Sequence, residues 1–362
     1  MRRAFELAAL AEHATSPNPM VGAVVLDASG KNAGEGFHAR AGDRHAERIA
    51  LQRAGARAHG GTLYVTLEPC YHQGRTPPCT AAVIDAEPKR VVVAMEDPDS
   101  RVAGAGIAAL RAAGIEVEVG VDREAAERLN RFYLKHRRTG RPWVTVKFAS
   151  SVDGKIATRT GESRWITGKA AREEGHRLRQ RHDAILVGAH TVRADDPELT
   201  NRLPDATRQP LRVVLDSRAR TAETARVLKD QEKAPTIVVV TADAPADRRE
   251  ALARTGVEVV ELLADATGRA DLPSLLDLLG GRGILSVLVE GGAFVHGALF
   301  DAGLVDGVVA FLAPIVIGGK EAPGAVGGQG VAKLAEAGRL VNLEVNQVGD
   351  DIMVSGDVHR DR

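Results

Sequence analysis

The sequence predicts two α/β domains that meet near residue 140. The chain has 362 residues, which is enough for two domains of ordinary size with separate cores. Strand-like and helix-like segments alternate along both halves, which is typical of sheets covered by helices. A polar stretch with proline and glycine, residues 137–142, separates the halves. We therefore expect one domain over residues 1–140 and a second over residues 141–362.

The first domain is expected to open with a helix and a β-hairpin. Residues 1–10 mix charged and apolar side chains, which favours an amphipathic helix over a secretion signal. Apolar runs over 21–26 and 33–38, with Gly30 between them, predict two strands and a turn. The remaining elements are expected to be a helix over 46–56, a strand over 62–67, a helix after Cys79, a strand over 90–94, a helix over 104–113, a strand over 115–119 and a helix over 122–138. This alternation predicts a mostly parallel sheet.

Strand-like runs and helical segments also alternate in the second domain. Strands are expected over 143–148, 184–187, 211–215, 236–240, 257–262 and 284–289, and helices over 169–180, 245–255 and 293–301. Apolar periodicity does not determine the order of these strands in their sheet.

Composition and charge argue against some classes of function. Lysine plus arginine equals aspartate plus glutamate at 48 each, so no net field attracts nucleic acid, and 3% aromatic residues leave few platforms for base stacking. No apolar run approaches the roughly 18 residues of a membrane span. We therefore expect a soluble, cytoplasmic protein that binds neither nucleic acid nor membrane.

His45, Glu47 and two cysteines form the pattern around which the first domain is organised. Cys70 and Cys79 are the only cysteines in the chain. One histidine followed by two thiolates is the ligand order of zinc deaminases, and it leaves the fourth coordination position for water. Such an ion lowers the pKa of its bound water to about 7, so hydroxide becomes available at neutral pH. The sequence therefore predicts zinc held by His45, Cys70 and Cys79.

Glu47 is the candidate proton shuttle of this site. Hydrolytic deamination moves protons twice, from the attacking water and onto the leaving amine, and one glutamate can carry both. An i, i+2 pair such as His45 and Glu47 is separated by about 200° on a helix, so the two side chains converge only at a helix start. We also expect Pro69 to begin a helix, whose positive end would favour the Cys70 thiolate.

Other interpretations of this pattern exist. The two cysteines could form a disulfide, which is rare in the cytosol. A structural zinc module could be fused to a binding domain, but closed zinc sites use four ligands and no third cysteine exists. A deaminase of free cytidine or of tRNA with an unrelated C-terminal domain would carry the same ligands. Eight residues separate the cysteines instead of the two that deaminases commonly have, which indicates a particular branch.

Two glycine-containing stretches could bind a dinucleotide. In the first, residues 104–109 (GAGIAA), about ten residues separate the first glycine from the preceding strand, so we interpret it as a helix start. The second, residues 290–292 (EGG), follows a buried strand directly and opens a helix, so its amides could bind a pyrophosphate. Glycines after a strand are as often simple turn residues.

These residues make the chain similar to a known family, the bifunctional riboflavin-biosynthesis deaminase/reductases. The resemblance covers nearly the whole chain. Residues 43–44 and Arg48 depart from the family pattern, which commonly has a proline before the histidine and an aliphatic residue after the glutamate, but none of them is a proposed ligand. The matching motifs are residues 15–22 (TSPNPMVG), 68–79 (EPCYHQGRTPPC), 102–107 (VAGAGI), 151–157 (SVDGKIA), 161–167 (GESRWIT) and 290–292 (EGG).

The resemblance implies a cytidine-deaminase-like three-layer α/β/α domain followed by a dihydrofolate-reductase-like α/β domain. It implies zinc and NADPH as cofactors, and a homo-oligomer, either a dimer or a tetramer. The first domain would remove the 2-amino group of a phosphorylated pyrimidine, 2,5-diamino-6-(5-phosphoribosylamino)pyrimidin-4(3H)-one. The second would reduce the ribosyl group of the product with NADPH. By motif position, cofactor contacts would be Ala149, Trp165, Thr191, Asp195, Ser217, Gly292, Ala293, Phe294, Val295, His296, Gly297 and Ala298, and substrate contacts would be Ser163, Arg179, Leu199, Arg202 and Glu290.

Overall fold

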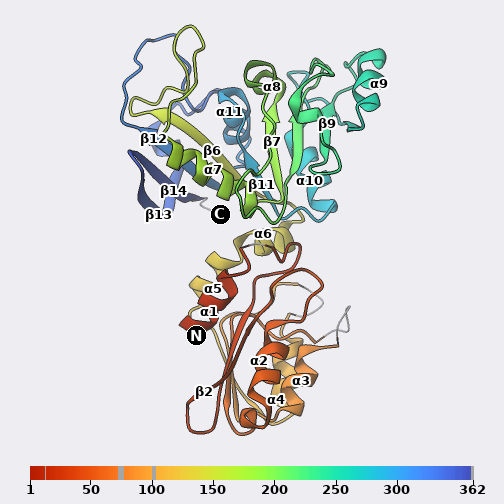
Figure 1. The fold of residues 1–362 in the computed structure, drawn as a ribbon, viewed down its shortest axis with the longest axis vertical. Coiled ribbons are helices and arrows are strands. Elements are labelled where there is room, and N and C mark those ends of the chain that lie inside the picture. The colour runs from red at the N-terminus through yellow and green to blue at the C-terminus, as the bar shows by residue number, and fades with distance from the viewer. Residues whose placement is uncertain (13, 72–76, 100–102, 360–362) are drawn as a thin grey trace. The chain divides into compact units, whose positions relative to one another are not determined.

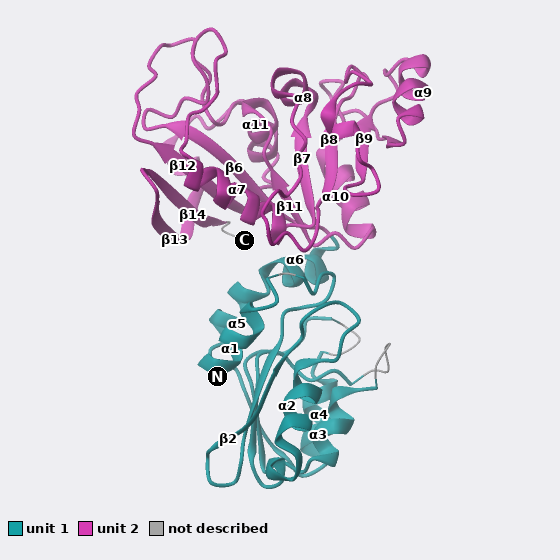
Figure 2. Ribbon diagram, viewed as in Figure 1, with its two compact units in different colours: residues 1–140 teal, residues 141–362 magenta. Residues whose placement is uncertain are grey.

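The chain forms two units that pack separately, residues 1–140 and 141–362 (Figure 2). The computed structural model describes residues 1–12, 14–71, 77–99 and 103–359. Motif residues 72–76 and 102 therefore lie outside the described part of the chain. No described helix has the length and apolar character that crossing a membrane requires.

A five-stranded sheet organises the first unit, in the order β2-β1-β3-β4-β5 (Figure 1). β1 (Gly22–Leu26) is antiparallel to β2 (Asn32–Phe37) and to β3 (Thr62–Val65), whereas β3, β4 (Arg90–Val93) and β5 (Glu116–Val119) are parallel. The sheet is mostly parallel in strand direction, as predicted: β1 alone is antiparallel to its two neighbours, and the other four strands run the same way. The helices of this unit are α1 (Arg2–Ala9), α2 (Ala46–Ala54), α3 (Cys79–Asp85), α4 (Ala105–Ala112), α5 (Arg123–Leu129) and α6 (Arg131–Thr139).

Helices cover both faces of this sheet, which makes three layers. α1 packs on one face through apolar contacts with β1. α2 lies on the other face, beside α3 and α4 (Figure 1). At Gly36 of β2 a Cβ atom would lie 2.5 Å from the Ala46 carbonyl oxygen, so only glycine lets α2 approach so closely. The start of α2, which carries His45 and Glu47, is thereby held against the sheet.

The predicted helix over 122–138 is in fact two helices, α5 and α6, which meet at Asn130. Asn130 has φ −105° and ψ 19°, outside the helical region. Its side-chain oxygen accepts from the Met20 N–H at 2.8 Å, and its amide donates to the Met20 carbonyl at 2.9 Å. The break thus anchors the segment that leads into β1, and this contact over a long sequence separation leaves no mark on local periodicity.

A nine-stranded sheet organises the second unit, in the order β10-β9-β8-β7-β11-β6-β12-β14-β13 (Figure 1). The strands from β10 to β12 are parallel, and the C-terminal hairpin joins β12 antiparallel. The strands are β6 (Trp143–Ser151), β7 (Ala184–Gly188), β8 (Leu211–Leu215), β9 (Thr236–Val240), β10 (Glu258–Glu261), β11 (Ser286–Val289), β12 (Gly307–Ala313), β13 (Arg339–Val348) and β14 (Asp351–His359). All six predicted strands are confirmed, and β12, β13 and β14 are additional.

Helices cover both faces of the central strands of this sheet. They are α7 (Lys169–Arg181), α8 (Ala189–Asp195), α9 (Ala246–Arg254), α10 (Leu272–Gly281) and α11 (Ala293–Asp301), of which α8 and α10 were not predicted. Leu275 and Leu299, from α10 and α11, pack against Val146 and Val289 on one face, and α8 and α9 pack on the other. Because β6, β7 and β11 are parallel neighbours, their C-terminal ends meet at one edge of the sheet.

Candidate active sites

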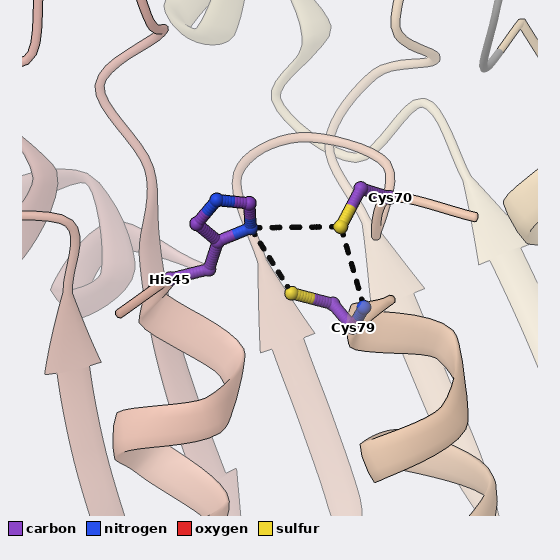
Figure 3. Close-up of side chains that lie close together, drawn as sticks. All are labelled: His45, Cys70 and Cys79. Atoms are coloured by element: carbon purple, nitrogen blue, oxygen red, sulfur yellow. Dashed lines mark hydrogen bonds between the residues drawn. The ribbon is translucent and has the colours of Figure 1, made fainter. Parts of the chain in front are cut away.

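The three predicted metal ligands meet at one point of the first unit (Figure 3). One ligand atom from each of His45, Cys70 and Cys79 lies within 4.8 Å of the other two. His45 Nδ1 is 3.2 Å from Cys79 Sγ and 3.5 Å from Cys70 Sγ. Both cysteines are free thiols. Two sulfurs and one imidazole are a donor set that suits zinc better than a hard cation.

Two helix starts and a loop position these side chains. His45 is the N-cap of α2, in an extended conformation, and Cys79 is the first residue of α3 after Pro78. Cys70 follows β3 in a segment that is not helical, so the prediction that Pro69 begins a helix is wrong. The amide of Cys79 donates to Cys70 Sγ at 3.3 Å. The Cys70 thiolate is therefore stabilised by the first amide of α3.

The two thiols differ in acidity when no metal is bound. The contact with Cys79, supported by His45, lowers the pKa of Cys70 to about 4. The same contact, together with burial, raises the pKa of Cys79. One thiolate is thus present at neutral pH, and metal binding has to displace the proton of the second thiol.

Glu47 lies in the first turn of α2 and is only 3% exposed. Burial, and secondarily the negative charge of Cys70, raises the pKa of Glu47 to about 7. Its Oε2 atom has no hydrogen-bond partner among the described residues. Leaving such an atom unsatisfied costs free energy, which a ligand at the site would recover. The carboxyl group is therefore placed to bind a ligand beside the metal group.

Glu68 connects the loop of Cys70 to the start of α4, a role that was not predicted from the sequence. Its carboxylate accepts from the backbone N–H groups of Asp97, Gly104 and Ile107 at 3.2, 3.0 and 3.1 Å. The only sequence signal for it is its place in the motif, two residues before Cys70.

Gly104 is the N-cap of α4 with φ 81°, which confirms that residues 104–109 are a helix start.

Two further polar side chains adjoin the metal group. His38 is buried, and its ring lies edge-on to that of His45, with centroids 5.2 Å apart. Asn18 contacts His38 Nε2 at 3.2 Å. Asn18 belongs to the motif over 15–22, whereas nothing in the sequence marks His38.

The second unit contains a cavity of about 740 Å³ at the C-terminal ends of β6, β7 and β11. Ligands of parallel sheets bind at this edge. The predicted residues that line the cavity are Ala149, Ser163, Trp165, Arg179, Thr191, Asp195, Leu199, Arg202, Glu290, Gly292, Ala293, Phe294, Val295 and His296. Residues from distant motifs are therefore brought together in one place.

Ser217, Gly297 and Ala298 were predicted to contact the cofactor but do not line this cavity. Ser217 Oγ accepts from the Ala270 N–H at 3.0 Å, although its own O–H can still donate. A Cβ atom at Gly297 would lie 2.2 Å from the backbone of Gly327, so this glycine allows a loop to pack against α11. The segment predicted to bind the cofactor, residues 292–298, thus combines residues that line the cavity with a glycine that lets a loop pack against α11.

Backbone geometry explains the two glycines that follow β11. A Cβ atom at Gly291 would lie 2.6 Å from the Cα atom of Val187. Gly292 is the N-cap of α11 with φ 46°. Glycine meets both demands without strain, and the turn brings the first residues of α11 to the cavity.

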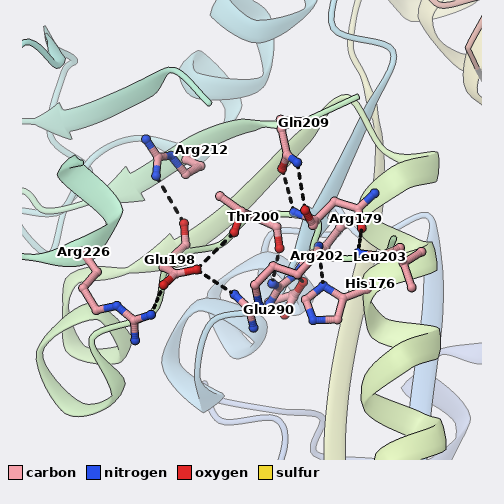
Figure 4. Close-up of polar contacts among 11 residues, drawn as sticks. His176, Arg179, Glu198, Thr200, Arg202, Leu203, Gln209, Arg212, Arg226 and Glu290 are labelled. Atoms are coloured by element: carbon pink, nitrogen blue, oxygen red, sulfur yellow. Dashed lines mark hydrogen bonds and ion pairs between the residues drawn. The ribbon is translucent and has the colours of Figure 1, made fainter. Parts of the chain in front are cut away.

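Arg179 and Glu290 were both predicted to contact the substrate, and in the structure they contact each other (Figure 4). Arg179 Nε and Nη2 donate to the two carboxylate oxygens at 2.7 and 2.9 Å, and Nη1 donates to the Thr200 carbonyl at 2.9 Å. Their side chains are 13% and 9% exposed. Burial acts to raise the pKa of Glu290, but the guanidinium outweighs it and holds that pKa at about 2. The pair is therefore ionised at neutral pH.

The cavity is also lined by polar side chains that were not predicted from the sequence, among them Lys147, His176 and Arg226. Lys147 precedes Ala149 by two residues on β6, so strand alternation could have placed it on the same face. His176 precedes Arg179 by three residues on α7, so helical spacing could have found it. No sequence signal marks Arg226, which begins a short 3-10 helix (Arg226–Leu228).

The fold and the two sites define a two-domain enzyme of the zinc-deaminase and reductase class. Residues 1–95 match the family model of the cytidine and deoxycytidylate deaminase zinc-binding region, and residues 142–354 match that of the RibD C-terminal domain. Riboflavin biosynthesis protein RibD of Bacillus amyloliquefaciens is 45% identical over 371 residues, which covers 100% of this chain and 99% of that protein. The chain therefore belongs to the RibD family, the bifunctional deaminase/reductases of riboflavin biosynthesis.

Solved structures of two relatives have the same fold. Acinetobacter baumannii RibD, form 1, matches with a TM-score of 0.88 and 39% identity, covering 99% of this chain and 98% of that chain. The diaminohydroxyphosphoribosylaminopyrimidine deaminase/5-amino-6-(5-phosphoribosylamino)uracil reductase of Thermotoga maritima matches with a TM-score of 0.85 and 37% identity, covering 99% and 97%. These comparisons confirm the predicted family and fold class.

Proposed function

We propose that residues 1–140 deaminate 2,5-diamino-6-(5-phosphoribosylamino)pyrimidin-4(3H)-one and that residues 141–362 then reduce its ribosyl group with NADPH. The product is 5-amino-6-(5-phosphoribitylamino)uracil. The observation that supports this most directly is the group of His45, Cys70 and Cys79 beside the unpartnered Oε2 atom of Glu47, in one chain with the cavity of the second unit. The name of the Thermotoga maritima relative gives both reactions for that protein.

In the deaminase half, His45, Cys70 and Cys79 hold zinc. Zinc, when bound by three protein ligands, makes a water nucleophilic at neutral pH. Glu47 accepts a proton from the attacking water at its free carboxylate oxygen and later gives a proton to the leaving amine. Burial favours both roles, because it raises the pKa of Glu47, to about 7 when no metal is bound, towards the pH at which a group can both take up and release a proton.

The zinc content of the purified chain tests this ligand set. We expect about one zinc per chain, because three protein ligands with an open position form a complete catalytic site. Cys70→Ser and Cys79→Ser should lose most of that zinc, since a hydroxyl is a much poorer zinc ligand than a thiolate. Elemental analysis after dialysis measures the stoichiometry. A wild-type chain that deaminates at full rate after metal removal would contradict the proposal.

In the reductase half, the start of α11 binds the cofactor phosphates. The substrate is bound by the cavity residues Ser163, Arg179, Leu199, Arg202 and Glu290. NADPH, when bound, supplies the hydride. Glu290 accepts from two of the five Arg179 N–H donors and the Thr200 carbonyl accepts from a third, which leaves two for a ligand. Glu290 therefore orients Arg179 in addition to any contact of its own with the substrate.

The reductase is expected to prefer NADPH to NADH. An acidic residue at the end of β8 could select NADH by accepting from the ribose 2′-hydroxyl. Asp216 is the candidate, but it is 1% exposed and accepts from the Thr221 N–H and hydroxyl at 2.6 and 2.7 Å. Arg218 and Arg220, just beyond it, are exposed and suit a 2′-phosphate.

Substitution of these arginines measures the preference. Arg218→Ala or Arg220→Ala should lower kcat/KM for NADPH by about ten- to more than a hundredfold, the effect of one lost charged hydrogen bond, and should hardly change that for NADH. Steady-state rates with both cofactors give the comparison. A wild-type enzyme that uses NADH as well as NADPH would rule this preference out.

One assay tests the proposed function as a whole. The purified chain is incubated with the diaminopyrimidinone, with and without NADPH, and the products are separated by mass. Without NADPH the deaminated ribosyl compound should accumulate, and with NADPH the ribityl compound should replace it. Deamination of cytidine or tRNA, with no reaction of the pyrimidinone, would support the alternative enzyme class.

The same proposal includes a homo-oligomer in the cytoplasm. β13 is an edge strand, and on this hairpin Leu343, Val345 and Ile352 are exposed. An exposed edge with apolar side chains is a template for pairing with another chain. The two free thiols of the metal group suit a reducing compartment. Light scattering of the purified chain distinguishes monomer, dimer and tetramer.

A further inference from the structure

We infer that Arg202 and Arg226 together bind a phosphate monoester at the wall of the reductase cavity, and that the Glu198 carboxylate occupies this phosphate site when no ligand is bound. All three residues line the cavity. The inference deepens the proposed function, on which the identity of the phosphorylated ligand rests. It adds Arg226 as a ligand contact and Glu198 as an internal competitor.

Glu198 bridges two guanidinium groups (Figure 4). Its Oε2 atom is 3.2 Å from Arg202 Nη1, and its Oε1 atom forms an ion pair with Arg226 Nη2. One oxygen thus faces each arginine. Arginine forks bind phosphate oxygens in the same way as carboxylate oxygens, so the carboxylate marks where a phosphate group can bind.

Hydrogen bonds hold the backbone around Glu198, whereas its side chain is 33% exposed and contacts Arg202, Arg226 and the Thr200 hydroxyl. Arg212, which is buried, donates from Nη1 to the Glu198 carbonyl at 3.3 Å. The Arg226 N–H donates to Asp196 Oδ1 at 2.8 Å, which joins the two segments. The backbone that carries Glu198 and Arg226 therefore stays in place if the Glu198 side chain rotates away.

The ion pairs of Glu198 are more exposed than the Arg179–Glu290 pair of the same cavity. The side chains of Glu198, Arg202 and Arg226 are 33%, 51% and 50% exposed, whereas Arg179 and Glu290 are almost fully buried. Exposed ion pairs contribute little to stability and exchange readily, but a buried pair is costly to break. An incoming phosphate can therefore replace Glu198, and it cannot replace Glu290.

Charge gives Glu198 its effect on affinity. Two guanidinium groups and one carboxylate leave one net positive charge, and a phosphate dianion neutralises the two arginines only when the carboxylate withdraws. Inorganic phosphate makes contacts only at this site, whereas a phosphorylated ligand also contacts the rest of the cavity. Glu198 therefore weakens the binding of free phosphate and keeps the cavity open to the larger ligand.

Kinetics of the reductase with the intact chain test the role of Arg226. Arg226→Ala should raise KM for the phosphorylated, pre-deaminated substrate by about tenfold or more, and should leave KM for its dephosphorylated form nearly unchanged. For the phosphorylated substrate, the KM of Arg226→Lys should lie between those of the wild type and Arg226→Ala. An effect on NADPH but not on NADH would assign the same site to the cofactor 2′-phosphate. Equal effects on all ligands, or none, would overturn the inference.

Titration calorimetry with inorganic phosphate tests Glu198 without any turnover. Glu198→Gln should bind phosphate up to about fivefold more tightly than the wild type, and Arg226→Ala should bind it more weakly than either. Weaker binding by Glu198→Gln would show that Glu198 positions the arginines and would overturn its role as competitor. Because no reaction is needed, this result stands even if the proposed substrate is not converted.

Arg282 and Glu258 provide the matched control. They form an ion pair of 2.7 Å, 35% and 50% exposed, in the same unit but outside the cavity. Arg282→Ala and Glu258→Gln should change neither phosphate binding nor any KM. A change in these variants as large as in Arg226→Ala would mean that general surface charge, and not the phosphate site, sets the affinity, and this would also overturn the inference.

Discussion

Glu47→Gln is expected to lower the rate of deamination by about 10²- to 10⁴-fold, which is the range that one positioned proton-transfer group contributes. Glutamine fills the same space as the 3% exposed glutamate beside the metal group, so the ligands stay in place. It cannot take a proton from water or give one to the leaving amine. Ammonia release measures the rate, and elemental analysis should find the same zinc content as in the wild type.

The second unit supplies an internal control for this variant. Reduction of the pre-deaminated substrate should be unchanged in Glu47→Gln, since the two sites belong to different units. Asp85→Asn, which alters an exposed carboxylate on α3, should affect neither reaction. Deamination at the wild-type rate in Glu47→Gln would contradict the shuttle, and loss of reduction in the folded variant would contradict separable sites.

The metal group could be predicted because its chemistry demands particular residue types in a particular order. Histidine, glutamate and two cysteines are visible in the sequence wherever the chain places them. The support of Cys70 could not be predicted, because it comes from the amide of a residue nine positions later and not from a helix at Pro69. The hydrogen bonds of Glu68 to the start of α4 could not be predicted either, because their donors are also backbone N–H groups far along the chain.

In the second unit, too, local features could be predicted from the sequence, whereas contacts between distant segments could not. Each predicted strand contains a run of apolar residues, buried in the sheet except in the partly exposed edge strand β10, so local sequence is sufficient to find it. The insertion of β11 between β7 and β6 is a property of the whole chain, and it brings Glu290 to Arg179 across 111 positions. β13 was missed although Val341, Leu343 and Val345 alternate with polar residues, which is the pattern of a strand. These apolar side chains are exposed in the structure and do not face a core.

Glu290→Gln is expected to destabilise the second unit by about 3–5 kcal/mol, the usual cost of removing one partner from a buried ion pair. The Arg179 guanidinium would stay charged and buried without its carboxylate. Urea denaturation followed by tryptophan fluorescence measures this unit alone, because the only two tryptophans, Trp143 and Trp165, both belong to it. Glu198→Gln, which breaks exposed ion pairs, is the control and should cost only about 0–1 kcal/mol.

The pH dependence of stability gives this prediction a second test. The pKa of Glu290 falls from about 4.5, its value in an unfolded chain, to about 2 in the folded chain. The ionised pair therefore stabilises the fold above pH 4.5, and this contribution is lost as the pH falls towards 2. The wild type should lose more stability over that interval than Glu290→Gln, which has no carboxylate to protonate at this position. If both proteins lose stability equally between pH 4.5 and 2, the pair does not contribute, and the destabilisation of Glu290→Gln then comes from packing rather than charge.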